Sequence, residues 1–154
     1  MPFIRTVTGD IAPDQLGRTA LHEHLIGHPL LAGEDPDFVL DSEAAAIREL
    51  RYFMEAGGRS VVEMSPVDYG RDVQALRRIS EASGVQIVTV AGYIKGKSAD
   101  ALVRDLNVTQ IADSLIRDVS EGIDGTGIRS GVLKAGTSLH RLTPNDEKNI
   151  QAVA

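Results

Sequence analysis

The sequence contains no cysteine, so it forms neither disulfides nor thiolate metal sites. It has no apolar segment of membrane-spanning length, and Met1–Arg5 lack the apolar core of a signal peptide. Basic residues are the minority, with 16 Lys and Arg against 22 Asp and Glu, and the net charge of −6 argues against nucleic-acid binding. We expect a cytoplasmic protein without nucleic-acid or membrane partners, in which histidine, carboxylate or a less usual ligand holds any metal.

What is present is ordinary for a soluble globular protein. The 154 residues are 42% hydrophobic and 25% charged. This length fits one compact domain of usual size.

Strand-like and helix-like segments alternate along the chain. After a short hairpin or leader near the N-terminus, the pattern predicts strands at residues 19–25, 60–64, 85–90 and 128–135. Glycines and prolines mark a loop after the first strand, namely Gly27, Pro29, Gly33 and Pro36. Helices are predicted at residues 42–56, 70–84 and 108–120 and from 143 onward. Strands separated by helices of this length form parallel βαβ units.

Two architectures contain such units, an open doubly wound sheet and a closed (β/α)8 TIM barrel. The open sheet usually carries a glycine-rich turn between its first strand and first helix, which Ile26–Leu30 lack. The glycine-rich segment Gly125–Gly131 precedes a strand, so it cannot place a helix N-terminus against a phosphate. We therefore predict an α/β fold of the barrel type. A full barrel needs about 250 residues, so this chain covers about its first four βα units.

Active sites of barrels lie at the carboxyl ends of the strands. His22 and His24 stand one residue apart at the end of the first strand, where alternate side chains share a face and two imidazoles form half of a metal site. The later strand ends offer Glu63, Ser65, Tyr93 and Lys134.

Lys134 is unusual because it lies within an apolar strand. Burying its charge there costs several kcal/mol unless another group compensates. The alternative is an outward-facing lysine whose long stem reaches solvent. The spacing alone leaves both open.

Four segments in order resemble the phosphotriesterase family of the amidohydrolase superfamily. Thr19–His24 is similar to the family's Thr-Leu-x-His-Glu-His opening, and Val61–Ser65 with Gly70–Val73 to its second strand and the start of the following helix. Glu121–Lys134 resembles its fourth-strand signature, and Leu142–Lys148 the segment that opens the next helix.

The resemblance implies a hydrolase with two divalent metal ions, zinc above all. His22 and His24 then bind the more buried ion, and Lys134, carboxylated by CO2, bridges both ions and is catalytic. A metal-activated hydroxide attacks a small phosphotriester, lactone or carboxylic ester. A lysine ammonium would repel both ions, whereas its carbamate is an anion with two oxygen donors. Manganese, iron and cobalt suit the same ligands.

The remaining polar residues receive more modest predictions. Tyr93 is expected at the pocket mouth as a substrate-binding residue, although the family often has an aromatic residue at the next position, here Ile94. Glu63 is a candidate partner behind the ligands, and Arg71 a structural tether. Asp72 favours its helix N-terminus. The two other histidines, His28 and His140, are predicted to lie in loops.

The resemblance covers about the first half of a family member. Two histidines from the fifth and sixth strands and an aspartate from the eighth complete the family's site. We therefore expect residues 1–154 to be the N-terminal half of a truncated hydrolase barrel, poorly active alone. The alternative is a non-catalytic half-barrel that pairs with a copy of itself or with a separate C-terminal half.

Overall fold

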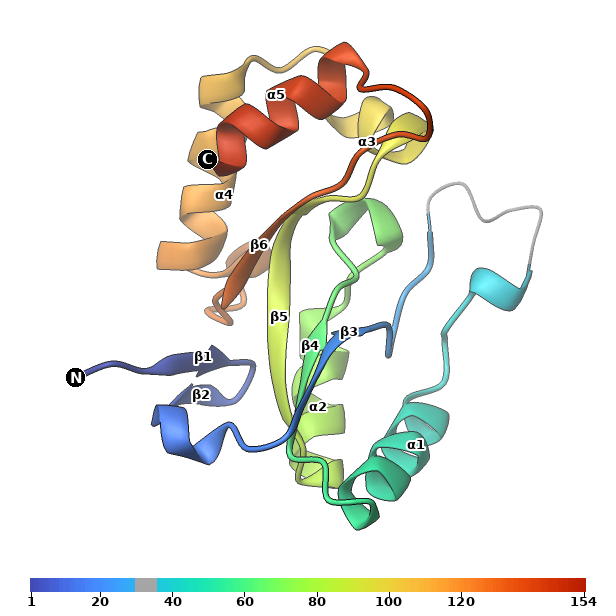
Figure 1. Cartoon of the computed structure of the whole chain (residues 1–154), viewed down its shortest axis with the longest axis vertical. Coiled ribbons are helices and arrows are strands. Elements are labelled where there is room, and N and C mark those ends of the chain that lie inside the picture. Colours follow the sequence, from blue (N-terminus) through green and yellow to red (C-terminus); the bar gives the residue numbers. More distant parts are fainter. Residues whose placement is uncertain (30–35) are drawn as a thin grey trace.

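The computed structural model describes residues 1–29 and 36–154, so Gly33 of the predicted loop lies outside the described residues. Its centre is a curved, fully parallel four-stranded sheet in the order β3-β4-β5-β6 (Figure 1). The strands are β3 (Thr19–Glu23), β4 (Ser60–Glu63), β5 (Gln86–Tyr93) and β6 (Val132–Ala135). This arrangement confirms the predicted α/β class with four βα units.

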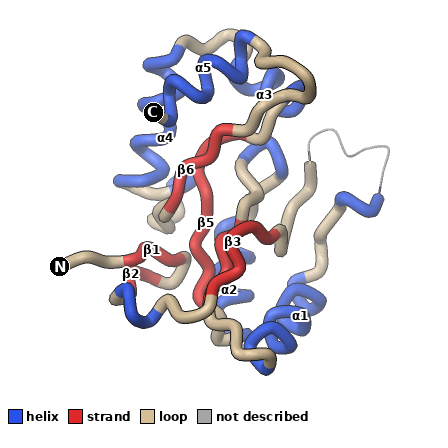
Figure 2. The backbone as a smooth tube through the Cα atoms, in the orientation of Figure 1, coloured by secondary structure: helices blue, strands red, loops and turns tan. Residues whose placement is uncertain are grey.

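Helices follow every strand and lie on the outer side of the sheet (Figure 2). They are α1 (Glu43–Glu55), α2 (Val73–Ser83), α3 (Gly96–Val103), α4 (Val108–Ser120) and α5 (Pro144–Val153). The sequence specifies several of their starts, because Ser42, Asp72 and Thr143 each cap a helix with a side-chain oxygen. None of the described helices combines the length and the apolar character that crossing a bilayer requires.

In the described part of the chain, a hairpin and four short 3-10 helices complete the fold. The hairpin pairs β1 (Ile4–Thr6) with β2 (Gly9–Ile11), as the sequence predicts, and the Val7 backbone N–H donates to Ile87 O at 2.8 Å. The 3-10 helices are η1 (Pro13–Gln15), η2 (Pro36–Phe38), η3 (Val67–Tyr69) and η4 (Ile123–Gly125).

The strand predictions at residues 85–90 and 128–135 differ most from the structure. β5 continues past Val90 to Tyr93 because Gly92, with φ +127°, stays within the strand beside Lys134. β6 begins only at Val132, because the Ile128 carbonyl accepts a hydrogen bond from Ile123 and closes a turn. Helix α3 was not predicted, since it begins at a glycine without a side-chain cap.

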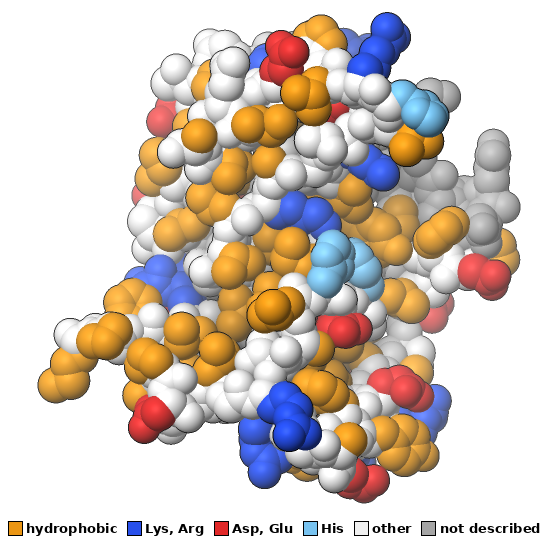
Figure 3. Space-filling model, in the orientation of Figure 1, with side chains coloured by type: hydrophobic (Ala, Val, Ile, Leu, Met, Phe, Trp, Pro, Cys, Tyr) orange, Lys and Arg blue, Asp and Glu red, His pale blue; other side chains and the backbone are white. Residues whose placement is uncertain are grey.

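The two faces of the sheet are covered unequally. On the helix side, Leu76, Ile79 and Ile87 are completely buried. On the concave side, Leu21 is 74% exposed, and an open cavity of about 280 Å³ is lined by Leu21, Val62 and Val132, among others. Apolar side chains accordingly occupy much of the face drawn in Figure 3.

Candidate metal centre

His22 and His24 lie side by side at the carboxyl end of β3. Their ring centroids are 5.3 Å apart at an interplanar angle of 62°, and the His24 ring also lies 4.8 Å from that of Tyr69. The β3–β4 register shifts between Ala20 and Glu23, so the strand is locally irregular where the pair begins. The predicted convergence of the two imidazoles is confirmed.

The environment of His24 favours a neutral imidazole. Burial, and then the positive charges of Lys134 and His22, lower the pKa of His24 from 6.5 to about 4. Its Nδ1 lies 2.8 Å from the Ser65 hydroxyl oxygen. Metal ions bind neutral imidazole, so the His24 ring has the protonation state that a metal ion would require near neutral pH.

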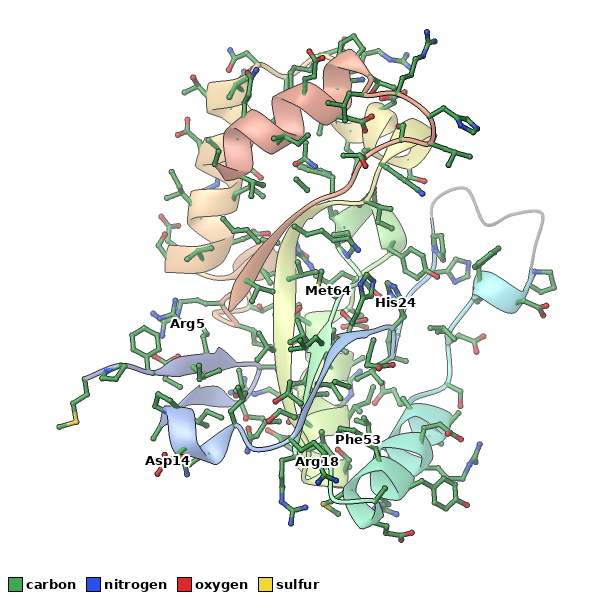
Figure 4. All side chains as sticks on the ribbon, viewed as in Figure 1. Arg5, Asp14, Arg18, His24, Phe53 and Met64 are labelled. Atoms are coloured by element: carbon green, nitrogen blue, oxygen red, sulfur yellow. The ribbon has the colours of Figure 1, made fainter. Side chains whose placement is uncertain are left out.

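Lys134 reaches toward the histidines from the opposite edge of the sheet. It lies on β6, is partly buried, and its Nζ donates to the Met64 carbonyl oxygen at 2.9 Å. Met64 follows β4 and lies close to His24 in Figure 4. Burial lowers the Lys134 pKa, against the opposing effect of Asp68 and Glu63. Of the two accounts left open above, the structure favours compensation within the protein over an amine extended into solvent.

Two buried carboxyl groups flank this cluster. The Glu63 oxygens accept the N–H groups of Leu25 (3.3 Å) and Ser65 (3.1 Å), and burial raises its pKa to about 7. Both Asp68 oxygens accept the Ile94 N–H, and burial also raises the pKa of Asp68. Sequence reasoning missed Asp68, although its place in a Pro-x-x-x-Gly turn directly after a strand end was an available signal.

Tyr93 has a different environment. Its side chain is buried in the cluster formed with α3 and α4, including Val103 and Leu115, and it hydrogen-bonds to Ser114. The structure therefore places Tyr93 on the helix-covered side of the sheet. Its proposed contact with substrate stays a prediction.

The other polar predictions concern structural contacts. The Arg71 guanidinium donates to Val90 O at 2.8 Å and to Asp118 at 3.2 Å, which confirms the tether. Asp72 caps α2 by accepting the Ala75 N–H. His28 and His140 lie outside the helices and strands, as predicted.

The donor set has a clear chemical limit. Among residues 1–29 and 36–154, no three His, Cys, Asp or Glu side chains gather into a metal-binding group. The cluster instead brings together two imidazoles and one amine. An ammonium repels cations, but a carbamate at the same nitrogen adds two anionic oxygens. The residues fit a metal site when Lys134 is carboxylated.

Comparison with known proteins identifies related molecules. The family model described as "Phosphotriesterase family" matches residues 2–154. N-acetyltaurine hydrolase from Rattus norvegicus is 32% identical, with 98% of this chain and 52% of that protein covered.

Solved structures agree with the sequence relationship. A lactonase from Listeria monocytogenes superposes with a TM-score of 0.90 at 31% identity, covering 99% of this chain and 52% of that chain. A mutant of the organophosphorus hydrolase from Deinococcus radiodurans gives 0.84 at 32% identity, covering 98% and 48%. The chain thus spans about half the length of the relatives it matches. The predicted half of a TIM barrel is confirmed.

Proposed function

Because the chain belongs to the phosphotriesterase family, a family of binuclear metal enzymes, we propose that it provides the first half of the metal centre of a hydrolase. The observation that carries this proposal is the convergence of His22, His24 and Lys134 from opposite edges of the sheet. Residues 1–154 form the N-terminal half of the barrel. The remaining ligands belong to the second half.

The histidines hold a divalent ion, for which zinc is the first candidate, through neutral ring nitrogens. The lowered pKa of Lys134 increases the share of neutral amine, the form that reacts with CO2. In that reaction an N–C bond forms, one amine proton leaves to solvent, and a carbamate with two oxygens results. When bound, the ions supply Lewis-acid polarisation and a lowered water pKa.

Neighbouring groups act on the lysine in opposite directions. The Met64 carbonyl holds Nζ at the end of β4, so the amine lies near the histidines before any ligand arrives. Asp68 and Glu63 oppose the loss of the ammonium charge, since both raise the Lys134 pKa. Burial has the larger effect, and the net shift is downward.

The substrate is a small molecule with a hydrolysable acyl or phosphoryl bond. The names of the lactonase and organophosphorus hydrolase relatives support lactones, carboxylic esters and phosphotriesters. N-acetyltaurine hydrolase, at similar identity, adds N-acyl bonds to this class. Substrate binding by Tyr93 and a cytoplasmic location are further parts of the proposal.

The exposed concave face supports a second candidate. Leu21 and its apolar neighbours are open to solvent on the side that a complete barrel encloses. A non-catalytic half-barrel would cover this face with a copy of itself or with a complementary C-terminal half. Sedimentation of the purified chain, alone and with the C-terminal half of a relative, detects either association.

Metal analysis of the chain purified with zinc and bicarbonate tests the main proposal. We expect bound zinc in the unaltered chain and in the control His140→Ala, and its loss in His24→Ala and Lys134→Ala. Mass spectrometry at near-neutral pH should show the added CO2 on Lys134. Zinc binding that is absent, or unchanged in Lys134→Ala, contradicts the proposal. Hydrolysis of a lactone, a phosphotriester and an N-acyl amine by the chain joined to a C-terminal half then distinguishes the substrates.

A further inference from the structure

Two buried polar side chains, Ser65 and Glu63, are linked to the His24 ring by hydrogen bonds in series. Its ring Nδ1 is 2.8 Å from Ser65 Oγ, and both Ser65 and Glu63 are completely buried. The Ser65 hydroxyl in turn hydrogen-bonds to the Glu63 carboxylate. Two buried polar side chains from β4 and the residues after it therefore connect in series to one imidazole nitrogen.

Counting donors and acceptors fixes the direction of these bonds. At pH 8, above its raised pKa, the Glu63 carboxylate is ionised and only accepts hydrogen bonds. Its two oxygens already accept backbone N–H groups from Leu25 and Ser65. The Ser65 hydroxyl proton is therefore donated to Glu63. Its oxygen is left as the acceptor for His24, so Nδ1 must carry the imidazole proton.

We propose that Ser65 and Glu63 are positioning residues, which hold His24 as the Nδ1–H tautomer and leave the Nε2 lone pair for a metal ion. The inference rests on the proposed role of His24 as a ligand. A neutral imidazole has a single N–H, and the hydrogen bond at one nitrogen decides which nitrogen is free to bind. Metal-binding histidines generally donate their second N–H to a fixed acceptor, and loss of that acceptor weakens metal binding by about 10–100-fold.

The cost of burying Glu63 supports this role. A fully buried carboxyl group is expensive in a fold, and the raised pKa reflects that expense. An apolar side chain at residue 63 would fill the interior without this cost. The carboxylate accepts the hydroxyl proton of Ser65 and so fixes the orientation of that hydroxyl, which an apolar side chain cannot do.

Nitrogen-15 NMR of the metal-free chain at pH 8, above the pKa of Glu63, observes the tautomer directly. The His24 signals are assigned by their loss in His24→Gln. We expect a protonated Nδ1 and an unprotonated Nε2. Ser65→Ala should give a mixture of both tautomers and a zinc affinity about 10–100-fold weaker.

Ser80→Ala is the matched control. Ser80, in α2, is also buried, but its hydroxyl donates to the backbone carbonyl of Val85, which follows the helix, at 2.7 Å. Removing it should leave the His24 tautomer and the zinc affinity unchanged. Equal effects of the two serine substitutions would mean that Ser65 contributes only to stability, and would overturn the proposal.

Glu63→Gln gives an independent readout if Ser65→Ala does not fold. The amide NH2 can donate to the serine oxygen, so the hydroxyl turns toward Nδ1 and the Nε2–H tautomer increases. An Nε2–H tautomer in the unaltered chain, or an unchanged tautomer in the variants that fold, overturns the inference. Nδ1–H without zinc binding contradicts the proposed function alone, whereas zinc binding with Nε2–H contradicts this inference alone.

Discussion

The two faces of the central sheet differ in how completely they are covered. Helices bury Leu76 and Ile79 fully against the outer face, whereas Leu21 on the concave face is 74% exposed. The strands are nonetheless apolar on both faces, as in sheets that are covered twice. The helix-covered outer face is therefore a complete hydrophobic core. The concave face has the apolar composition of a core, but no other part of the described chain covers it.

The largest expected effect contrasts two leucines. Leu76→Ala removes a fully buried side chain from the helix-covered layer and should lower the free energy of unfolding by about 2–5 kcal/mol. Leu21→Ala, on the open face, should change it by about 0.5 kcal/mol or less. Urea unfolding followed by circular dichroism measures both. If the two costs are equal, the concave face is covered in solution and the comparison fails.

Two arginines on the helix-covered side of the sheet compare a buried ion pair with an exposed one. The Arg71 side chain is buried and donates to Val90 on β5 and to Asp118 on α4. Arg71→Ala leaves Asp118 without this partner and should cost about 3 kcal/mol. Arg77 lies on exposed α2 surface beside Glu81, and Arg77→Ala should cost about 0.5 kcal/mol or less. The same unfolding assay applies. A larger loss in Arg77→Ala would show that burial does not decide the strength of these pairs.

A smaller effect depends on pH. The Glu63 pKa is raised from 4.5 to about 7, so the folded state retains a proton that the unfolded chain has already lost. This contribution is fully present below pH 4.5 and is lost as pH rises through 7, about 2 kcal/mol between pH 5 and 7. His24, whose pKa is lowered to about 4, contributes in the opposite direction over this pH range. Glu63→Gln should therefore change the slope of the metal-free protein, making it about 2 kcal/mol more stable at pH 7 relative to pH 5 than the unaltered chain is.

Glu23→Gln provides the control for this pH dependence. Glu23 is the register partner of Glu63 on β3 but is exposed, so its substitution should leave the slope in place. Unfolding measured at several pH values in the presence of a chelator compares the variants. An unaltered slope in Glu63→Gln would assign it to another group.

Local signals predicted much of this fold. The apolar period of residues 108–120 predicts α4 to the residue, and Thr143-Pro144 marks the start of α5. The end of β5 was harder to predict from the sequence, because a glycine usually indicates the end of a strand. Gly92 continues the strand because its backbone lies close to that of Lys134 on β6, which only the structure shows. Helix α3 has no capping side chain, so no local signal announced it.

The contacts of the candidate site were likewise predictable from the sequence only where they join residues of one short segment. Alternation along a strand predicts the approach of His22 and His24, since both belong to one short segment. The contacts of Lys134 with Met64 and of His24 with Ser65 join residues 70 and 41 positions apart. Such contacts depend on how strands pair and curve, which residue spacing does not contain. Asp68 is hidden for the same reason, since its partner Ile94 follows another strand.

The curl of the four-stranded sheet has a consequence for the proposed metal centre. β6 and β4 are separated by β5, so in a flat sheet they would lie about 9.6 Å apart, farther than a lysine side chain comfortably bridges. The bond from Lys134 to Met64 therefore depends on curvature. Stacking into flat, edge-paired aggregates would separate the lysine from the histidines while the helices stayed intact. If the proposed function holds, loss of bound zinc would be the earliest sign of such damage, ahead of any change in helix content.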